Sequence, residues 1–134
     1  MVSRLIEIVI DCHDPAAQAT FWAAVLGYQV MDSGGHAVEI APWEQEPADL
    51  VEQVRQAPGV PTLVFVPVPE GKTVKNRLHL DVSPIDRSQE AEVERLIGLG
   101  ARHADVGQGA QRWVVLADPE GNEFCVLRSL AANA

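Results

Sequence analysis

Cysteine, aromatic residues and basic residues are all scarce in this 134-residue sequence, and each scarcity argues against a class of protein. The two cysteines, Cys12 and Cys125, are too few for the disulfide framework of a small secreted protein, so we expect both to be free thiols. Aromatic residues make up 5%, and 10 Lys and Arg stand against 19 Asp and Glu, which gives a net charge of −9. Because an acidic chain without a basic, aromatic-rich stripe repels phosphate backbones, we expect no nucleic-acid partner.

Long hydrophobic runs are also missing. The longest apolar stretches are strand-sized, as from Leu63 to Pro69, whereas a membrane-spanning helix needs about 20 apolar residues. Glu7 stands where a signal peptide would have its apolar core. We therefore expect a cytoplasmic protein that does not contact a membrane. Since 47% of the residues are hydrophobic, the chain can bury a core without a metal or disulfide, and we expect one domain over residues 1–134.

The first half of the chain begins with a strand pattern followed by a helix pattern. Residues 5–11 alternate between apolar and mixed positions, which predicts a strand. Asp14 and Pro15 then form a helix-start signal, and Gly27 ends the apolar periodicity, so we expect a helix of about three turns with Trp22 in its core. Residues 28–31 and 36–41 predict a hairpin around the turn at residues 32–35.

Residues 42–61 hold four of the nine prolines and have the character of an insertion. Pro47 is placed to open a short helix whose Leu50, Val51 and Val54 share one side. Such a helix either packs over a cleft or lies on the surface. Residues 62–68 predict the next strand.

The same pattern then begins again, which is the most informative feature of the sequence. Residues 77–82 alternate as a strand, Asp86 is the expected cap of a second helix with Gln89 as its capping-box partner, and Gly100 ends that helix. Three further strands are expected at residues 102–106, 113–117 and 123–128. Glu7 aligns with His79 and Asp14 with Asp86, an offset of 72 in both pairs. The sequence therefore predicts an α+β fold of two tandem β-α-β-β-β modules, covering about residues 4–70 and 74–130.

Strand alternation also assigns the two faces of each sheet. A helix that crosses its sheet buries the apolar side chains beneath it, which are Ile6, Ile8, Ile10, Leu78, Leu80 and Val82. The opposite face carries charges that a dry core would not hold, namely Glu7, Asp11, Arg77, His79 and Asp81. Two such sheets facing one another would form a cup with a partly polar wall.

Several segments resemble the vicinal oxygen chelate superfamily, the glyoxalase and bleomycin-resistance group, and especially its small glyoxalase-like branch. The matching segments are residues 11–15 (DCHDP), 21–28 (FWAAVLGY), 72–81 (KTVKNRLHLD) and 113–128 with its ADPEGNEFC run. The resemblance implies paired modules that form a cup-shaped pocket for small molecules, commonly as a homodimer. It also implies a range of activities, from isomerases, epimerases and dioxygenases to antibiotic sequestration, so the fold is better specified than the reaction.

In metal-dependent members of this superfamily, the first and last strands of each module each supply one ligand to a divalent ion. On this chain the resemblance assigns the metal positions to Glu7, His79 and Cys125, while the fourth falls within the apolar residues 63–66. One ligand is therefore missing, and we expect no standard metal centre and no cofactor. Zinc is the alternative, because carboxylate, imidazole and thiolate leave an open fourth position for water.

The polar face offers further candidate roles. His79 and Glu7 are candidates for general acid and base, although Arg77 and Asp81 beside His79 could simply balance charge. Trp113 is placed either to stack on a planar ligand or to pack. Basic residues gather in the 72–77 segment, where they either bind an anion or form a solvated loop.

The hypothesis from the sequence is a cup-shaped, small-molecule-binding protein without a complete metal centre. Its ligand-binding residues are expected to be Trp113, Arg77, Asp81 and Asp11. The alternative is a zinc-assisted or acid/base isomerase or lyase of the glyoxalase type, in which His79 and Glu7 move a proton.

Overall fold

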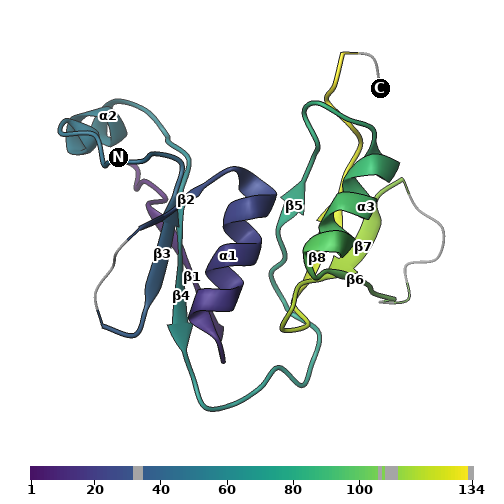
Figure 1. Cartoon of the computed structure of the whole chain (residues 1–134). Coiled ribbons are helices and arrows are strands. Elements are labelled where there is room, and N and C mark those ends of the chain that lie inside the picture. Colours follow the sequence, from purple (N-terminus) through teal and green to yellow (C-terminus); the bar gives the residue numbers. More distant parts are fainter. Residues whose placement is uncertain (32–34, 106, 108–111, 133–134) are drawn as a thin grey trace. The chain divides into compact units, whose positions relative to one another are not determined.

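Each half of the chain forms a four-stranded mixed sheet with a long helix packed beside it (Figure 1). The computed structural model describes residues 1–31, 35–105, 107 and 112–132. It divides into two compact units, residues 1–71 and 72–134. The prediction of one domain over the whole chain is not tested by this division and stays a prediction.

The first unit contains four strands and two helices. Its elements in chain order are β1 (Glu7–Cys12), α1 (Pro15–Leu26), β2 (Gln29–Met31), β3 (Val38–Ala41), α2 (Leu50–Gln56) and β4 (Thr62–Pro67). The sheet order is β1-β4-β3-β2, with β1 and β4 parallel and the other pairs antiparallel. The predicted hairpin is therefore confirmed in β2 and β3, while the turn proposed for it falls on residues 32–34, outside the described part of the chain.

The second unit repeats this arrangement without the inserted helix. Its elements are β5 (Asp81–Val82), α3 (Gln89–Leu99), β6 (Arg102–His103), β7 (Val114–Ala117) and β8 (Glu123–Val126). The sheet order is β5-β8-β7-β6, again with the first and last strands parallel. The predicted α+β fold of two tandem β-α-β-β-β modules is confirmed. In each module the first strand therefore lies directly beside the last one.

The core of each unit lies between the helix and its sheet. In the first unit Trp22 of α1 is buried with Ile40 and Phe65, and its ring meets that of Phe21 edge to face at 5.3 Å. In the second unit Leu96 of α3 is buried with Phe124. Each fully buried side chain of this size contributes about 1.5–3 kcal/mol. Side chains on the sheet face that the helix does not cover are not needed for this core and can line a binding site.

Helix α1 begins and ends where the sequence predicts. Asp14 Oδ1 accepts a hydrogen bond from the Ala17 N–H at 3.1 Å, and Gly27 adopts a left-handed conformation with φ of 69°. The prediction that Asp86 caps helix α3 is wrong. Ser88 is the N-cap, and its hydroxyl accepts a hydrogen bond from the Ala91 N–H at 3.1 Å. Asp86 instead pairs with Arg87 at 3.0 Å.

Two residues expected beneath the helices are exposed. Ile6 is 56% exposed because it precedes the paired part of β1, whose register begins with Glu7 opposite Thr62. Leu78 is 89% exposed because β5 covers only two residues rather than the six predicted. The prediction that these side chains lie in the core is wrong. The alternation holds within the strands, where Ile8, Ile10 and Val82 are half-buried.

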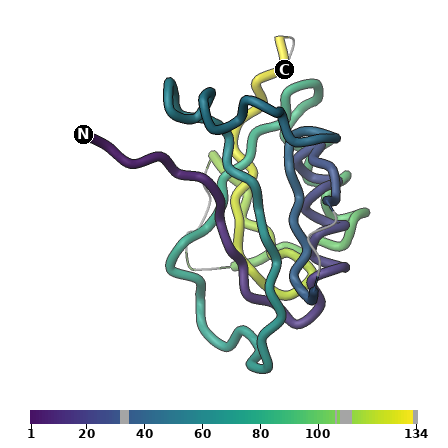
Figure 2. Tube along the Cα trace, turned by 90° about the vertical axis from the view of Figure 1, so that its left-hand side faces the viewer, coloured from purple at the N-terminus to yellow at the C-terminus, as the bar shows by residue number. Residues whose placement is uncertain are grey.

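The inserted segment forms the short helix α2 at one end of the first unit's strands (Figures 1 and 2). It begins at Leu50 rather than at Pro47. Leu50 and Val54 are half-buried, but Val51 is 70% exposed, so the predicted apolar side is narrower than expected. None of the described helices combines the length and the apolar character that crossing a membrane requires.

Candidate functional site

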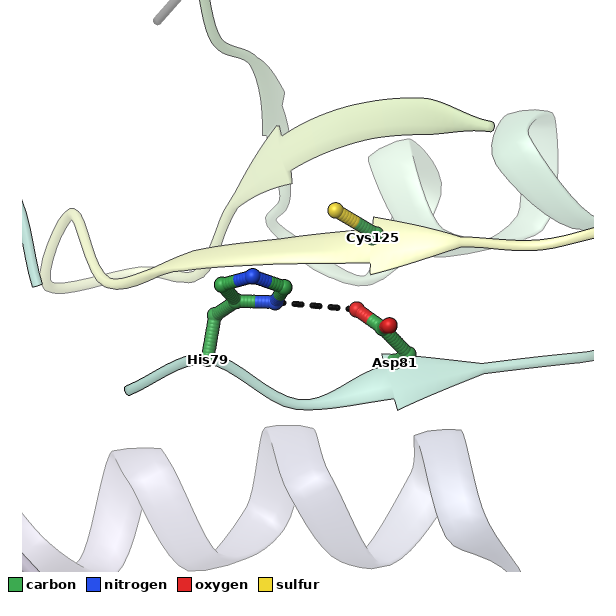
Figure 3. A group of neighbouring side chains, drawn as sticks. All are labelled: His79, Asp81 and Cys125. Carbon is green, nitrogen blue, oxygen red and sulfur yellow. Dashed lines mark hydrogen bonds and ion pairs between the residues drawn. The ribbon is translucent and has the colours of Figure 1, made fainter. Parts of the chain in front are cut away.

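Strand register in the second unit brings together three side chains of types that can ligate a metal. The parallel pairing of β5 with β8 sets Asp81 opposite Cys125, and His79 precedes Asp81 by two residues on the same chain segment. Donor atoms of His79, Asp81 and Cys125 all lie within 4.8 Å of one another (Figure 3). We call these residues the His79 cluster. Figure 3 shows that two of them come from the β5 segment and one from the neighbouring strand β8.

A direct hydrogen bond orders this cluster. His79 Nδ1 lies 2.9 Å from Asp81 Oδ1, and since a carboxylate can only accept, the imidazole donates through Nδ1–H. This bond leaves Nε2 of His79 as the ring nitrogen with a free lone pair in the neutral imidazole. This contact is compatible both with a role of Asp81 in orienting the imidazole and with simple charge balance beside it.

Cys125 provides a buried thiol at the same place. Cys125 is only 8% exposed. Burial raises the pKa of the Cys125 thiol, and the charge and hydrogen bonding of Asp81 raise that pKa further, while Lys75 lowers it. The thiol is therefore protonated near neutral pH. A bound metal would have to displace that proton.

The His79 cluster borders a cavity of about 350 Å³. Apolar surface comes from Trp113, Val115 and Leu127, and the remaining lining residues are Lys75, His79, Asp81, Glu123 and Cys125. Trp113 is 40% exposed, so a large indole surface is free to contact a ligand. Apolar walls with a few convergent polar groups are typical of small-molecule sites.

Hydrogen bonds fix the loop that leads to β5. Lys72 Nζ lies 2.8 Å from Glu123 Oε1, and the Asn76 N–H donates to Glu123 Oε2 at 3.1 Å. The Asn76 side chain also donates to Asn122 Oδ1 at 2.9 Å. Burial by itself would raise the pKa of Glu123, but the bonds from Lys72 and Asn76 outweigh it and lower that pKa. Lys72 is thus engaged within the protein rather than available to an anion.

Glu7 occupies a different cavity, in the first unit. This smaller cavity of about 120 Å³ also borders Glu39, Glu46, Trp43 and Thr62. Glu7 is exposed, and the Thr62 hydroxyl donates to it at 3.5 Å. Burial raises the pKa of Glu39, and the charges of Glu7 and Glu46 raise it further.

The predicted site residues thus fall into separate groups. The second-unit cavity brings together His79, Asp81, Cys125 and Trp113, all of which the sequence analysis named. Arg77 is exposed and is not among the described residues that line this cavity. Asp11 and Glu7 belong to the first unit, so their predicted roles beside His79 stay predictions.

Two features of the cavity were missed from the sequence. Asp81 was assigned to ligand binding but not to a metal, although the parallel pairing of the first and last strands of a module would have set it opposite Cys125. Val115 and Leu127 carry no chemical signal, although strand alternation would have placed Val115 on the face of Trp113 and Leu127 on the face of Cys125.

Residues 7–127 match a family model described as a glyoxalase-like domain. The chain belongs to this family. The resemblance to the vicinal oxygen chelate superfamily is therefore confirmed over almost the whole sequence. No curated protein sequence matches the chain.

Solved structures share the glyoxalase-like fold at low sequence identity. A glyoxalase/bleomycin resistance protein/dioxygenase family enzyme from Burkholderia phytofirmans PsJN is 20% identical, with a TM-score of 0.62 over 92% of this chain and 97% of that chain. The fosfomycin resistance protein FosX from Mesorhizobium loti is 12% identical, with a TM-score of 0.63 over 94% and 92%. A mutant FosX from Listeria monocytogenes, in complex with Mn(II) and 1S,2S-dihydroxypropylphosphonic acid, is 14% identical, with a TM-score of 0.63 over 96% and 94%. At these identities the likeness shows the fold alone.

Proposed function

We propose that this glyoxalase-like protein binds a small, partly apolar molecule in the cavity of its second module. The observation that supports this is the lining itself, in which the half-exposed Trp113 shares a cavity of about 350 Å³ with the His79 cluster. The volume is near the lower end of ligand sites, which favours a small molecule. We also propose that the protein is cytoplasmic and forms a homodimer. Glu7, Arg77 or Asp11 would then contribute to ligand binding.

A thermal-shift screen of metabolites and natural products tests this function. A compound that binds the folded cavity raises the Tm in a concentration-dependent way. Trp113→Ala should abolish that stabilisation, and the control Leu130→Ala, at an exposed apolar residue of the same unit that is not among the described residues lining the cavity, should retain it. A stabilising compound whose effect survives both Trp113→Ala and His79→Ala would show that the ligand binds elsewhere.

A second candidate function is zinc-assisted catalysis, and the His79 cluster is the specific observation that favours it. Imidazole nitrogen, carboxylate oxygen and thiolate sulfur are all zinc ligands, and three protein ligands with one open position are typical of catalytic zinc. Tetrahedral bonds of about 2.0–2.3 Å require donor atoms roughly 3.3–3.8 Å apart, so Asp81 would have to give up its 2.9 Å hydrogen bond from His79 Nδ1–H to bind the same ion. The residues therefore fit this metal better than Mg²⁺ or Ca²⁺, which prefer oxygen ligands.

In that case each residue has a definable role. His79, Asp81 and Cys125 would hold the ion, which would supply Lewis-acid stabilisation of an oxyanion on the substrate. Trp113 would orient the apolar part of the substrate. The acid/base roles proposed for His79 and Glu7 apply only without metal at His79, because a coordinated imidazole no longer exchanges protons freely.

Metal analysis of protein purified without chelators or a histidine tag separates the two candidates. Near-stoichiometric zinc that disappears in Cys125→Ala and in His79→Ala, but persists in Cys12→Ala and His103→Ala, would establish the zinc site. Cys12 is also a buried free cysteine and His103 is an exposed histidine of the same unit as His79, so both controls match in residue type. Protein that contains no zinc but still binds a ligand would exclude the zinc-assisted function and support the binding function.

A further inference from the structure

One charged pair beside the cavity neutralises itself, and a second does so only when its histidine is protonated. Glu123 is 2.8 Å from Lys72, and Asp81 is 2.9 Å from His79. The Lys72–Glu123 pair is well shielded, since the two side chains are 19% and 13% exposed. Glu123 is therefore not a free negative charge facing a ligand, and Asp81 contacts His79 rather than Lys75.

Lys75 is different, because it lines the same cavity without an acidic partner among the described residues. The Lys75 Nζ donates to the Asn76 carbonyl oxygen at 3.5 Å, which is at the limit of a hydrogen bond. Lys75 lowers the pKa of Cys125, so its positive charge acts at the His79 cluster. The cavity therefore holds an ammonium group with donor capacity to spare.

Apolar side chains complete the other part of the lining. Trp113, Val115 and Leu127 offer one indole and two aliphatic surfaces within the same cavity of about 350 Å³. A planar apolar body would stack on the indole, and its burial would supply most of the affinity. An ammonium group next to such a surface favours a ligand that carries one negative group beside its apolar body.

We propose that the ligand of this cavity is a small organic anion, with a carboxylate that meets Lys75 and a planar apolar body that contacts Trp113. This inference rests on the proposed binding function and narrows it to one class of ligand. With zinc, an ion held by His79, Asp81 and a Cys125 thiolate would carry no net charge and leave Lys75 as the unbalanced group. Without zinc, Asp81 contacts His79, so the Lys75 ammonium still has no carboxylate partner among the described residues.

Three probes with one indole body test this proposal directly: indole-3-acetate, indole-3-acetamide and tryptamine. Their affinities are measured by NMR titration or calorimetry at low and at high salt. The acetate should bind about three- to tenfold more tightly than the neutral amide at low salt, and tryptamine should bind more weakly than both. The preference for the acetate should shrink in high salt because the exposed ammonium is screened.

Substitutions assign the preference to individual residues. Lys75→Gln should remove the advantage of the acetate and leave the amide unchanged, whereas Trp113→Ala should weaken all probes. Arg102→Gln removes the same formal charge from the exposed strand β6 and should change nothing. The acetate preference is a ratio of two affinities measured on the same variant. A modest loss of stability in that variant therefore does not obscure it.

Equal binding of acetate and amide, tightest binding of tryptamine, or an acetate preference that survives Lys75→Gln would each overturn the anion proposal. If none of the probes binds while the metabolite screen yields a Trp113-dependent ligand, the anion proposal is wrong and the binding function stands. If the screen also yields no such ligand, both are wrong.

Discussion

His79 Nδ1 and Asp81 Oδ1 are 2.9 Å apart, although side chains two positions apart on an extended chain need not meet. The contact holds the imidazole in one orientation beside Cys125, whose strand neighbour is Asp81. One carboxylate thus touches both other members of the His79 cluster. Replacing Asp81 should therefore change the orientation of the His79 ring as well as remove a negative charge from the cluster.

This contact predicts the tautomer of His79. In the wild-type protein at a pH where His79 is neutral, the Nδ1-protonated tautomer should predominate, whereas a free imidazole in water favours Nε2–H. Asp81→Ala should shift the tautomer ratio several-fold toward Nε2–H, because the acceptor for Nδ1–H is gone. The ¹⁵N shifts of the ring in metal-free protein report the ratio. The exposed His103 serves as the internal reference, and an unchanged His79 spectrum in Asp81→Ala would contradict the geometry.

The Lys72–Glu123 pair should contribute more to stability than a surface pair does. Its side chains are 19% and 13% exposed, against 69% and 54% for the Arg55–Glu52 pair on α2. Double-mutant cycles measured by urea unfolding should give a coupling free energy of about 1 kcal/mol or more for Lys72 and Glu123, and about 0.3–0.5 kcal/mol for Arg55 and Glu52. Equal couplings would mean that burial does not strengthen the inner pair.

Asp118 organises the turn that precedes β8, and its buried carboxylate should be costly to remove. It is 1% exposed, and its Oδ1 accepts from the backbone N–H groups of Glu120 and Asn122, both at 2.9 Å. The Asn122 side chain donates to its Oδ2 at 3.0 Å, and Gly121 takes a φ of 89° that the turn requires. Asp118→Ala should destabilise the protein by about 2–4 kcal/mol, because several donors lose their acceptor at once.

A matched control for this turn is Asp105→Ala. Asp105 is exposed and its carboxylate accepts from the Gly107 N–H at 2.8 Å, so its removal leaves a donor that water can reach. We expect a loss of about 0.5 kcal/mol or less. Chemical denaturation of both variants measures the difference, and similar losses would show that the burial of Asp118 is not decisive.

Glu39 predicts a pH-dependent stability in the first unit. Its pKa in the folded state is raised above the ordinary 4.5 by burial and by the charges of Glu7 and Glu46. Ionisation is therefore more costly in the folded than in the unfolded state, so this cost is fully present above the raised pKa and disappears below 4.5. Glu39→Gln should raise the Tm by roughly 1–3 °C at neutral pH, with the gain vanishing as the pH falls toward 4.

Glu46→Gln separates the two causes of this shift. It removes one of the neighbouring charges but leaves the partial burial of Glu39 and the charge of Glu7, so the pKa of Glu39 should fall only part of the way toward 4.5. NMR titration of the Glu39 side chain measures that pKa. Stabilisation by Glu39→Gln that is the same at all pH values would show that packing, rather than charge, is responsible.

Local patterns in the sequence determined the elements of this protein. Alternation, the Asp14 cap and the Gly27 stop are short-range effects, and they correctly predicted β1, α1 and the repeated module. One error, the cap of α3, arose where a neighbouring residue competed for the same local role. Ser88 caps α3 because its side chain reaches the Ala91 N–H, while Asp86 is engaged by Arg87.

The site depended on long-range pairing that no local pattern encodes. The sequence pointed to His79, Cys125 and Trp113 individually, and the family resemblance named two of them as metal positions. Only the tertiary structure joined Asp81 to Cys125 across parallel strands and placed both beside Trp113. The physical reason is that a strand's own periodicity decides which face a side chain takes, whereas its partner across the sheet depends on the register between segments more than forty residues apart.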